Sequence, residues 1–195
     1  MSTPFDSLIT RRSVPARFLG PPGPDETAIE QIIAAGIRVP DHGKLAPWRF
    51  ILFQGDASKR AGHLLLRLRL DRGETLADED ISIEQHRFSR APLVIGVVSR
   101  AADHPKIPIW EQQLSAGAVC MNLLNAAHTL SFSAQWLTDW PVYDLEACSL
   151  LGLEEGEQLA GFVYIGTTQV APTERPRPSP RALTTYWKGP QSKDE

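Results

Sequence analysis

The sequence predicts a single domain that mixes helices and strands around one sheet, of the α/β or α+β class. Short apolar runs typical of buried strands alternate along the chain with longer segments of helical periodicity. The chain has 195 residues, of which 42% are hydrophobic and 22% are charged, as is usual for one globular domain. It contains no internal repeat. We therefore expect about four strands and a larger share of helix.

The first half of the chain is expected to hold three helices and one strand. Residues 4–12 form a short helix with apolar residues on one side. Asp25 is a plausible N-cap for a second helix, which runs to about Gly36. The aromatic, apolar run 48–54 (WRFILFQ) suits a buried strand, and Asp56 is expected to cap a leucine-rich helix after it. Mixed charges up to Glu84 indicate solvated helix and turn.

The second half contains the longest predicted helix, over residues 108–130. Its middle, 115–124, is apolar or small nearly all round, and a helix without a polar face has to be buried on every side. It therefore lies in the core or between two subunits. The run 92–99 before it is rich in β-branched residues, which favours a strand covered on both faces.

The remaining segments follow this helix. Residues 132–137 form another apolar patch, residues 142–151 a further helix and residues 159–165 (LAGFVYI) a buried strand. The proline-rich stretch 172–181 cannot hold a strand ladder, so we expect an extended arm or a disordered tail there.

Composition excludes several classes of protein. The net charge is −3 with both signs interleaved, so nothing indicates binding to nucleic acid or to a membrane surface. The longest apolar run, 91–98, is far too short to span a membrane, and the N-terminus has no apolar signal core. Cys120 and Cys148 fit neither a metal knuckle nor a disulfide framework. We expect a cytoplasmic protein without a bound metal.

Familiar catalytic signatures are absent: the sequence has no GxGxxG, GxxxxGK[ST], HExxH or GxSxG. The first candidate site is therefore the triplet Arg11, Arg12 and Ser13 at the end of the first helix. Two guanidinium groups and a hydroxyl together match a phosphate. The alternative is that these cations only complement the helix dipole.

Two further loops carry polar groups. Arg38, Asp41 and His42 lie in a loop that prolines stiffen, which suits a binding site. The alternative is a surface turn with an ion pair and an exposed histidine. The segment 133–138 ends with Gln135, Trp136 and Thr138, which can offer hydrogen bonds beside an aromatic plane to a heteroaromatic ring. Such a tryptophan is otherwise a half-buried core residue.

Taken in order, these motifs resemble the FMN-dependent nitroreductase family, in particular its compact bacterial members. They are RRS, the AGxRxPD-H loop, APW, RAPLVI, SAGAVCMNLLNAA, the tryptophan patch and FVYIG. The resemblance implies an α+β, three-layer fold with a central, mainly antiparallel sheet flanked by helices. It also implies an intertwined homodimer with FMN at the subunit interface, in which residues 1–186 form one domain and residues 187–195 a disordered tail.

The resemblance assigns functional positions residue by residue. It places the FMN phosphate and ribityl chain at Arg11, Arg12 and Ser13. The other positions expected beside the flavin are Arg38, His42, Gln135, Trp136, Leu137 and Thr138. The stretch linked with the nicotinamide nucleotide, NADH or NADPH, is Ala126, Ala127, His128, Thr129, Leu130 and Ser131.

This sequence departs from the family pattern at three places. Leu137 stands where compact members have arginine, which weakens the expected grip on phosphate. Ser131 and Ser133 stand where they have glycine, which narrows the expected nucleotide channel. Lys44 and Leu45 occupy a place where larger members have asparagine, so a flavin hydrogen bond is expected to be missing.

The resemblance implies a ping-pong oxidoreductase in which NAD(P)H reduces flavin N5 and a nitroaromatic, quinone or similar acceptor then takes the electrons. No catalytic side chain is expected for the hydride step, because the flavin carries the chemistry. One alternative is a fragmenting or dehalogenating flavoenzyme of the same fold, but residues 71–84 leave little room for the lid that such enzymes use. Another is a non-enzymatic flavin-binding or regulatory dimer.

Overall fold

Four antiparallel strands form the centre of the computed structural model, which describes residues 3–189. The strands are β1 (Trp48–Gln54), β2 (Leu93–Ser99), β3 (Ser133–Leu137) and β4 (Gln158–Gly166), and their order across the sheet is β1-β2-β4-β3. The predicted strands are thus confirmed. The mainly antiparallel sheet of the α+β expectation is confirmed as well, since all three strand pairs are antiparallel.

The central strand β2 is buried along its whole length, as its β-branched sequence predicts. Its side chains point alternately into two separate apolar clusters, one on each face of the sheet. In the first cluster, Phe88 stacks on Phe53 with ring centroids 4.5 Å apart and meets Phe162 edge-on at 5.1 Å. The second cluster places Ile95 and Val163 against the long helix α5.

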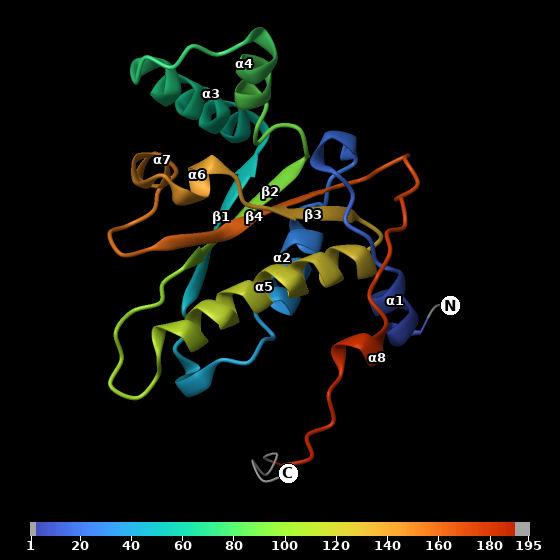
Figure 1. Cartoon of the computed structure of the whole chain (residues 1–195). Helices are drawn as coiled ribbons and strands as arrows, with labels where there is room; N and C mark the ends of the chain where they lie inside the picture. The colour runs from blue at the N-terminus through green and yellow to red at the C-terminus, as the bar shows by residue number, and fades with distance from the viewer. Residues whose placement is uncertain (1–2, 190–195) are drawn as a thin grey trace, which may run out of the picture.

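Helices cover both faces and so complete the three layers (Figure 1). On one face lie α3 (Gly55–Asp71), α4 (Asp78–Gln85), α6 (Trp140–Tyr143) and α7 (Leu145–Leu150). The other face carries α2 (Glu26–Gly36) and α5 (Ile109–Thr129). Outside these layers lie α1 (Pro4–Thr10) and the arm after β4, with its short helix α8 (Pro180–Leu183).

The structure corrects three expectations about the helices. Helix α3 starts at Gly55, directly after β1, so Asp56 lies in its first turn and is no cap. The single helix expected over 142–151 is two short helices, because Asp144 accepts a hydrogen bond from Ala147 N (2.9 Å) and starts α7 anew. The segment before Glu84 is mostly exposed as expected, yet Glu84 itself is only 2% exposed. In contrast, Asp25 caps α2 as predicted.

Helix α5 is buried on one face only within this chain. Val119, Cys120 and Leu123 are fully buried against the sheet. The opposite face exposes 66% of Trp110 and 54% of Leu114. Within the stretch 115–124, which the sequence expects to be covered on every side, Met121 is 38% exposed in this chain. The core of one chain therefore does not cover this stretch completely, and its position between two subunits stays a prediction. Of the predicted disordered tail 187–195, residues 190–195 lie outside the described residues.

Candidate functional site

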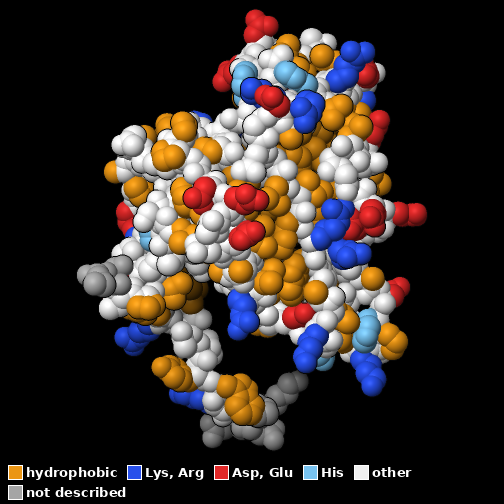
Figure 2. Space-filling view, turned by 180° about the vertical axis from the view of Figure 1, so that it is seen from behind, with side chains coloured by type: hydrophobic (Ala, Val, Ile, Leu, Met, Phe, Trp, Pro, Cys, Tyr) orange, Lys and Arg blue, Asp and Glu red, His pale blue; other side chains and the backbone are white. Residues whose placement is uncertain are grey.

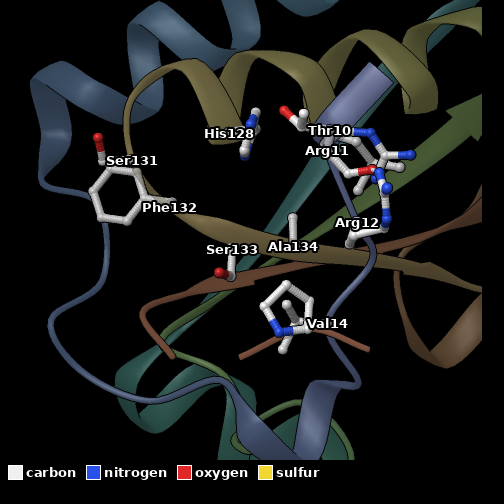
Figure 3. A pocket seen from close by; sticks show the side chains of 11 residues that line it. Thr10, Arg11, Arg12, Val14, His128, Ser131, Phe132, Ser133 and Ala134 are labelled. Carbon is white, nitrogen blue, oxygen red and sulfur yellow. Dashed lines mark hydrogen bonds between the residues drawn. The ribbon is translucent and has the colours of Figure 1, made fainter. Parts of the chain in front are cut away.

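A cavity of about 330 Å³ lies where the end of α1, the end of α5 and the start of β3 meet (Figure 3). It brings Arg11 and Arg12, predicted from the sequence as phosphate ligands, beside His128 and Ser131, predicted from the sequence as nucleotide contacts. The full lining comprises Thr10, Arg11, Arg12, Val14, Leu124, His128, Ser131, Phe132, Ser133, Ala134 and Pro172. Residues more than 110 positions apart in the sequence thus share one site.

Two local features hold these walls together. The chain after Arg12 runs along the outer edge of β3, because Val14 N donates to Ala134 O (3.1 Å) and Ala16 N donates to Gln135 Oε1 (2.6 Å). At the other wall, Ser131 takes a left-handed conformation (φ 66°), which reverses the chain from α5 into β3. Hydrogen bonds to β3 therefore fix one wall of the cavity, and the turn at Ser131 fixes the other.

The charges in this cavity favour an anion. Arg11 Nε is buried without a hydrogen-bond partner. Burial lowers the pKa of the Arg11 guanidinium, and the neighbouring charges of Arg12 and Arg177 lower it further. Arg12 forms an ion pair with Glu174 of the C-terminal arm. The site therefore has three arginines around the single carboxylate of Glu174, and one buried N–H group lacks an acceptor. An additional anion would stabilise this arrangement.

Ser13, the third member of the predicted phosphate triplet, does not line this cavity. Its side chain is exposed at the next position along the chain. The Arg11 and Arg12 pair therefore carries the positive charge of the site, and the part of Ser13 stays a prediction.

A second hollow of about 520 Å³ lies between α2 and α5. It joins Arg38 to three of the positions that the sequence linked with the nicotinamide nucleotide. Its lining is Gln31, Ala35, Arg38, Asn122, Asn125, Ala126, Thr129 and Leu130. Ala127 points elsewhere, since it is fully buried in the core. Asn122, which sequence reasoning missed, closes the end of α2 by donating from Nδ2 to Arg38 O (2.9 Å).

His42 lies at the far end of α5 from the arginine cavity. Its Nδ1 is 2.7 Å from Glu111 Oε2 in the first turn of α5, while His128 is in the last turn. At 1.5 Å rise per residue, these two turns are roughly 25 Å apart. A single chain therefore does not bring His42 and Arg11 to one ligand.

The loop carries an exposed His42, as the surface-turn alternative expects, but the carboxylate of Asp41 binds backbone groups and not the arginine of that alternative. Asp41 accepts hydrogen bonds from Leu45 N (3.0 Å) and Ala46 N (2.9 Å). The hydroxyl of Ser115 on α5 donates to Pro40 O (2.6 Å). No periodicity in the sequence could have pointed to Ser115, because its partner is a backbone carbonyl far away in the chain.

The four predicted flavin positions on and after β3 point in different directions. Gln135 and Leu137 face the layer of α3, α6 and α7, where Leu137 packs against the first apolar cluster and Gln135 binds the backbone of Ala16. Trp136 faces α5, is 38% exposed and donates from Nε1 to Ala160 O (3.1 Å). Thr138 is exposed just beyond the strand.

Within residues 3–189, no group of three metal-ligating side chains could hold a metal ion. Over the same range, no helix is long and apolar enough to cross a membrane.

Comparison with known proteins gives one consistent answer. The sequence model of a protein family described as "Nitroreductase family" matches residues 8–167. The Escherichia coli K12 protein named "Putative NAD(P)H nitroreductase YdjA" is 34% identical over 190 residues, which is 94% of this chain and 98% of that protein. A Haemophilus influenzae protein named "Putative NAD(P)H nitroreductase" is 34% identical over 161 residues, covering 82% of this chain and 85% of that protein.

Solved structures agree on the fold. A nitroreductase-like family protein from Bacillus cereus superimposes with a TM-score of 0.81 at 20% identity, over 97% of this chain and 98% of that one. A nitroreductase with bound FMN from Bacteroides fragilis superimposes with a TM-score of 0.70 at 18% identity, over 96% of this chain and 100% of that one.

The left-handed turn at Ser131 generates a prediction about stability. Replacing Ser131 with Gly is expected to stabilise the protein by about 0.5–1 kcal/mol, because glycine adopts a positive φ without a Cβ clash. Such a gain raises Tm by roughly 1–4 °C in a domain of this size. Ser133→Gly is the matched control, since Ser133 lies in β3, where glycine is expected to lower Tm. Calorimetry of both variants measures the difference, and a lower Tm for Ser131→Gly would contradict the argument.

Proposed function

Because the chain belongs to the nitroreductase family, we propose that it is an FMN-dependent oxidoreductase that takes hydride from NADH or NADPH and reduces a nitroaromatic, a quinone or a similar acceptor. The observation that carries this proposal is the cationic cavity at Arg11 and Arg12, with its unpaired buried Nε. The names of the curated relatives and the FMN bound to a protein of the same fold support it.

The cavity fits the phosphate end of FMN. A phosphate there would accept the hydrogen bond that Arg11 Nε lacks, and it would compensate the positive charge left by one carboxylate among three arginines. His128 and Ser131 add two side chains able to hydrogen-bond on the opposite wall. The residues present therefore suit an anionic group, although Leu137 supplies no positive charge where compact family members are expected to have an arginine.

In the proposed reaction, the cofactor and the protein have different roles. Bound FMN supplies the redox chemistry, accepting hydride from NAD(P)H and passing electrons to the acceptor. The protein would hold the phosphate at Arg11 and Arg12, and the partly exposed indole of Trp136, further along β3, is available to a bound ring. Since nucleotide and acceptor would use the same flavin face in turn, ping-pong turnover is expected.

Four observations support a homodimer that shares its sites. Helix α5 exposes an apolar stripe that includes Trp110, Leu114 and Met121. Apolar side chains also form a band across the face seen from behind (Figure 2). Arg11 and His42 are too far apart in one chain to touch one flavin, so both can contact it only if a second copy supplies one of them. The outer edge of β1 has no strand partner among residues 3–189.

The proposed activity is tested by anaerobic mixing of the FMN-loaded protein with NADH and with NADPH. The flavin absorbance near 450 nm is expected to bleach and to return when a nitroaromatic or quinone is added. Initial rates at several concentrations of both substrates are expected to give parallel double-reciprocal lines. A flavin that binds but is not reduced by either nucleotide would instead support the non-enzymatic alternative.

Arg11→Ala tests the phosphate contact. A hydrogen bond to a charged group contributes about 1.5–3 kcal/mol, so the variant is expected to bind FMN roughly 10- to 150-fold more weakly. Riboflavin has the same ring without the phosphate, and its affinity is expected to change little. Arg17→Ala is the matched control, because Arg17 is exposed against the Phe18 ring, outside the cavity lining. Equal losses for FMN and riboflavin, measured by titration calorimetry, would refute a phosphate contact.

Sedimentation at micromolar concentration tests the dimer. The wild type is expected to have twice the chain mass of 21.6 kDa. Leu114→Glu places a charge on the exposed face of α5 and is expected to give folded monomers with weakened FMN binding. Leu64→Glu is the control, because Leu64 is similarly exposed (46%) but lies on α3, in the opposite layer. A folded wild-type monomer that binds FMN tightly would rule out the shared site.

A further inference from the structure

The chain leaves β3 through a strained residue. Asp139 has φ 126° and ψ 174°, a backbone region that is essentially restricted to glycine. It directly follows Thr138, the last of the positions expected beside the flavin. A non-glycine residue keeps such a conformation only when its surroundings enforce it.

Hydrogen bonds to its carboxylate hold Asp139 in this conformation. Arg87 Nη1 donates to Asp139 Oδ2 (2.6 Å), and Trp140 N donates to Asp139 Oδ1 (2.7 Å) at the start of α6. Partial burial raises the pKa of the Asp139 carboxyl group, but the two hydrogen bonds together with the positive charges of Arg87 and Arg90 lower it overall. The strained turn is thus tied by a charged contact to a residue 52 positions away in the sequence.

Arg87 is itself fixed in the interior, with only 3% of its surface exposed. Its Nε donates to Glu84 Oε2 (2.9 Å), and Glu84 also accepts from Trp140 Nε1 (3.0 Å) and Arg69 Nη1 (3.2 Å). The network therefore connects α3, α4 and α6 with the end of β3. A buried arginine with this many fixed contacts has little freedom to follow a moving partner.

We propose that Arg87 and Asp139 are positioning residues for the FMN site: they fix the exit of the chain from β3 and with it the path of residues 136–138. The inference rests on the proposed function and deepens it. Neither side chain needs to touch the flavin. The buried network links α3 and α4 to the end of β3, the edge strand that carries Trp136. The ring of Trp136 and the hydroxyl of Thr138 are therefore already in place before a ligand binds.

Asp139→Gly separates positioning from stability. Glycine adopts the observed φ and ψ without strain, so the relief offsets the lost ion pair and Tm is expected to stay within about 3 °C of wild type. The turn loses its tether, however, and FMN is expected to bind at least tenfold more weakly by flavin-fluorescence titration. Asp139→Asn keeps one side-chain oxygen, which can accept the hydrogen bond from Arg87 Nη1 and so keep the tether, and it is expected to restore affinity to within about threefold of wild type.

Asp144→Gly is the matched control. Asp144 is also an N-cap held by an arginine, since it accepts from Arg72 Nη1 (2.6 Å) and Arg72 Nη2 (3.0 Å). Its φ of −103° is ordinary, and it starts α7 away from the end of β3. This variant is expected to lose thermal stability while binding FMN within twofold of wild type.

Hydrogen exchange of the flavin-free protein provides a readout that does not depend on FMN. Exchange over residues 135–138 is expected to be at least tenfold faster in Asp139→Gly and unchanged in Asp144→Gly. Unchanged exchange, or FMN binding within twofold of wild type in Asp139→Gly, would overturn the proposal. If the wild type itself binds no FMN, the proposed function fails, whereas unchanged exchange alone still refutes the role of the pair.

Discussion

Burial of β2 and β4 between two separate apolar clusters is the constraint on which the other elements depend. Every residue of β2 is buried, and β4 is buried over nearly all its length. Because successive side chains enter opposite clusters, a register slip of one residue would exchange the two sets and leave both clusters wrongly filled. The pairing of β4 with β3 then fixes where the edge strand lies, and with it one wall of the arginine cavity.

The cavity and the strained turn use this scaffold in different ways. At the start of β3, the backbone of residues 14–16 forms hydrogen bonds to β3 and so places Arg11 in the cavity wall. Arg11 is partly buried there, and the loss of hydration disfavours its charged form. At the end of β3, Asp139 keeps an unfavourable backbone conformation because Arg87 is immobile. One end of this five-residue strand thus lies beside a partly desolvated charge and the other end beside a strained backbone, and such unfavourable features are typical of binding sites.

The sequence predicts well what depends on local pattern. The bounds of β1 follow from its apolar run, the start of α2 from Asp25 and the full burial of β2 from its β-branched residues. It predicts poorly what depends on partners far along the chain. The segment of mixed charges before Glu84 indicates solvent, yet Glu84 is buried because Arg87, Arg69 and Trp140 all bind it. Likewise, serine at position 131 does not itself indicate a positive φ, and only the glycine expected there in the family points to one.

The departures from the family pattern gain a physical meaning from the same geometry. Leu137 packs into the cluster beneath α3, α6 and α7, on the face of β3 away from α5. An arginine there would have to leave the core to reach an anion, whereas leucine adds to the packing that holds the strand. The positive charge at this end of the molecule therefore comes from the chain after α1, where the path of Arg11 depends on hydrogen bonds to β3. Leu137 thus helps to hold β3 in place by packing, and β3 in turn positions Arg11 through the hydrogen bonds of residues 14–16.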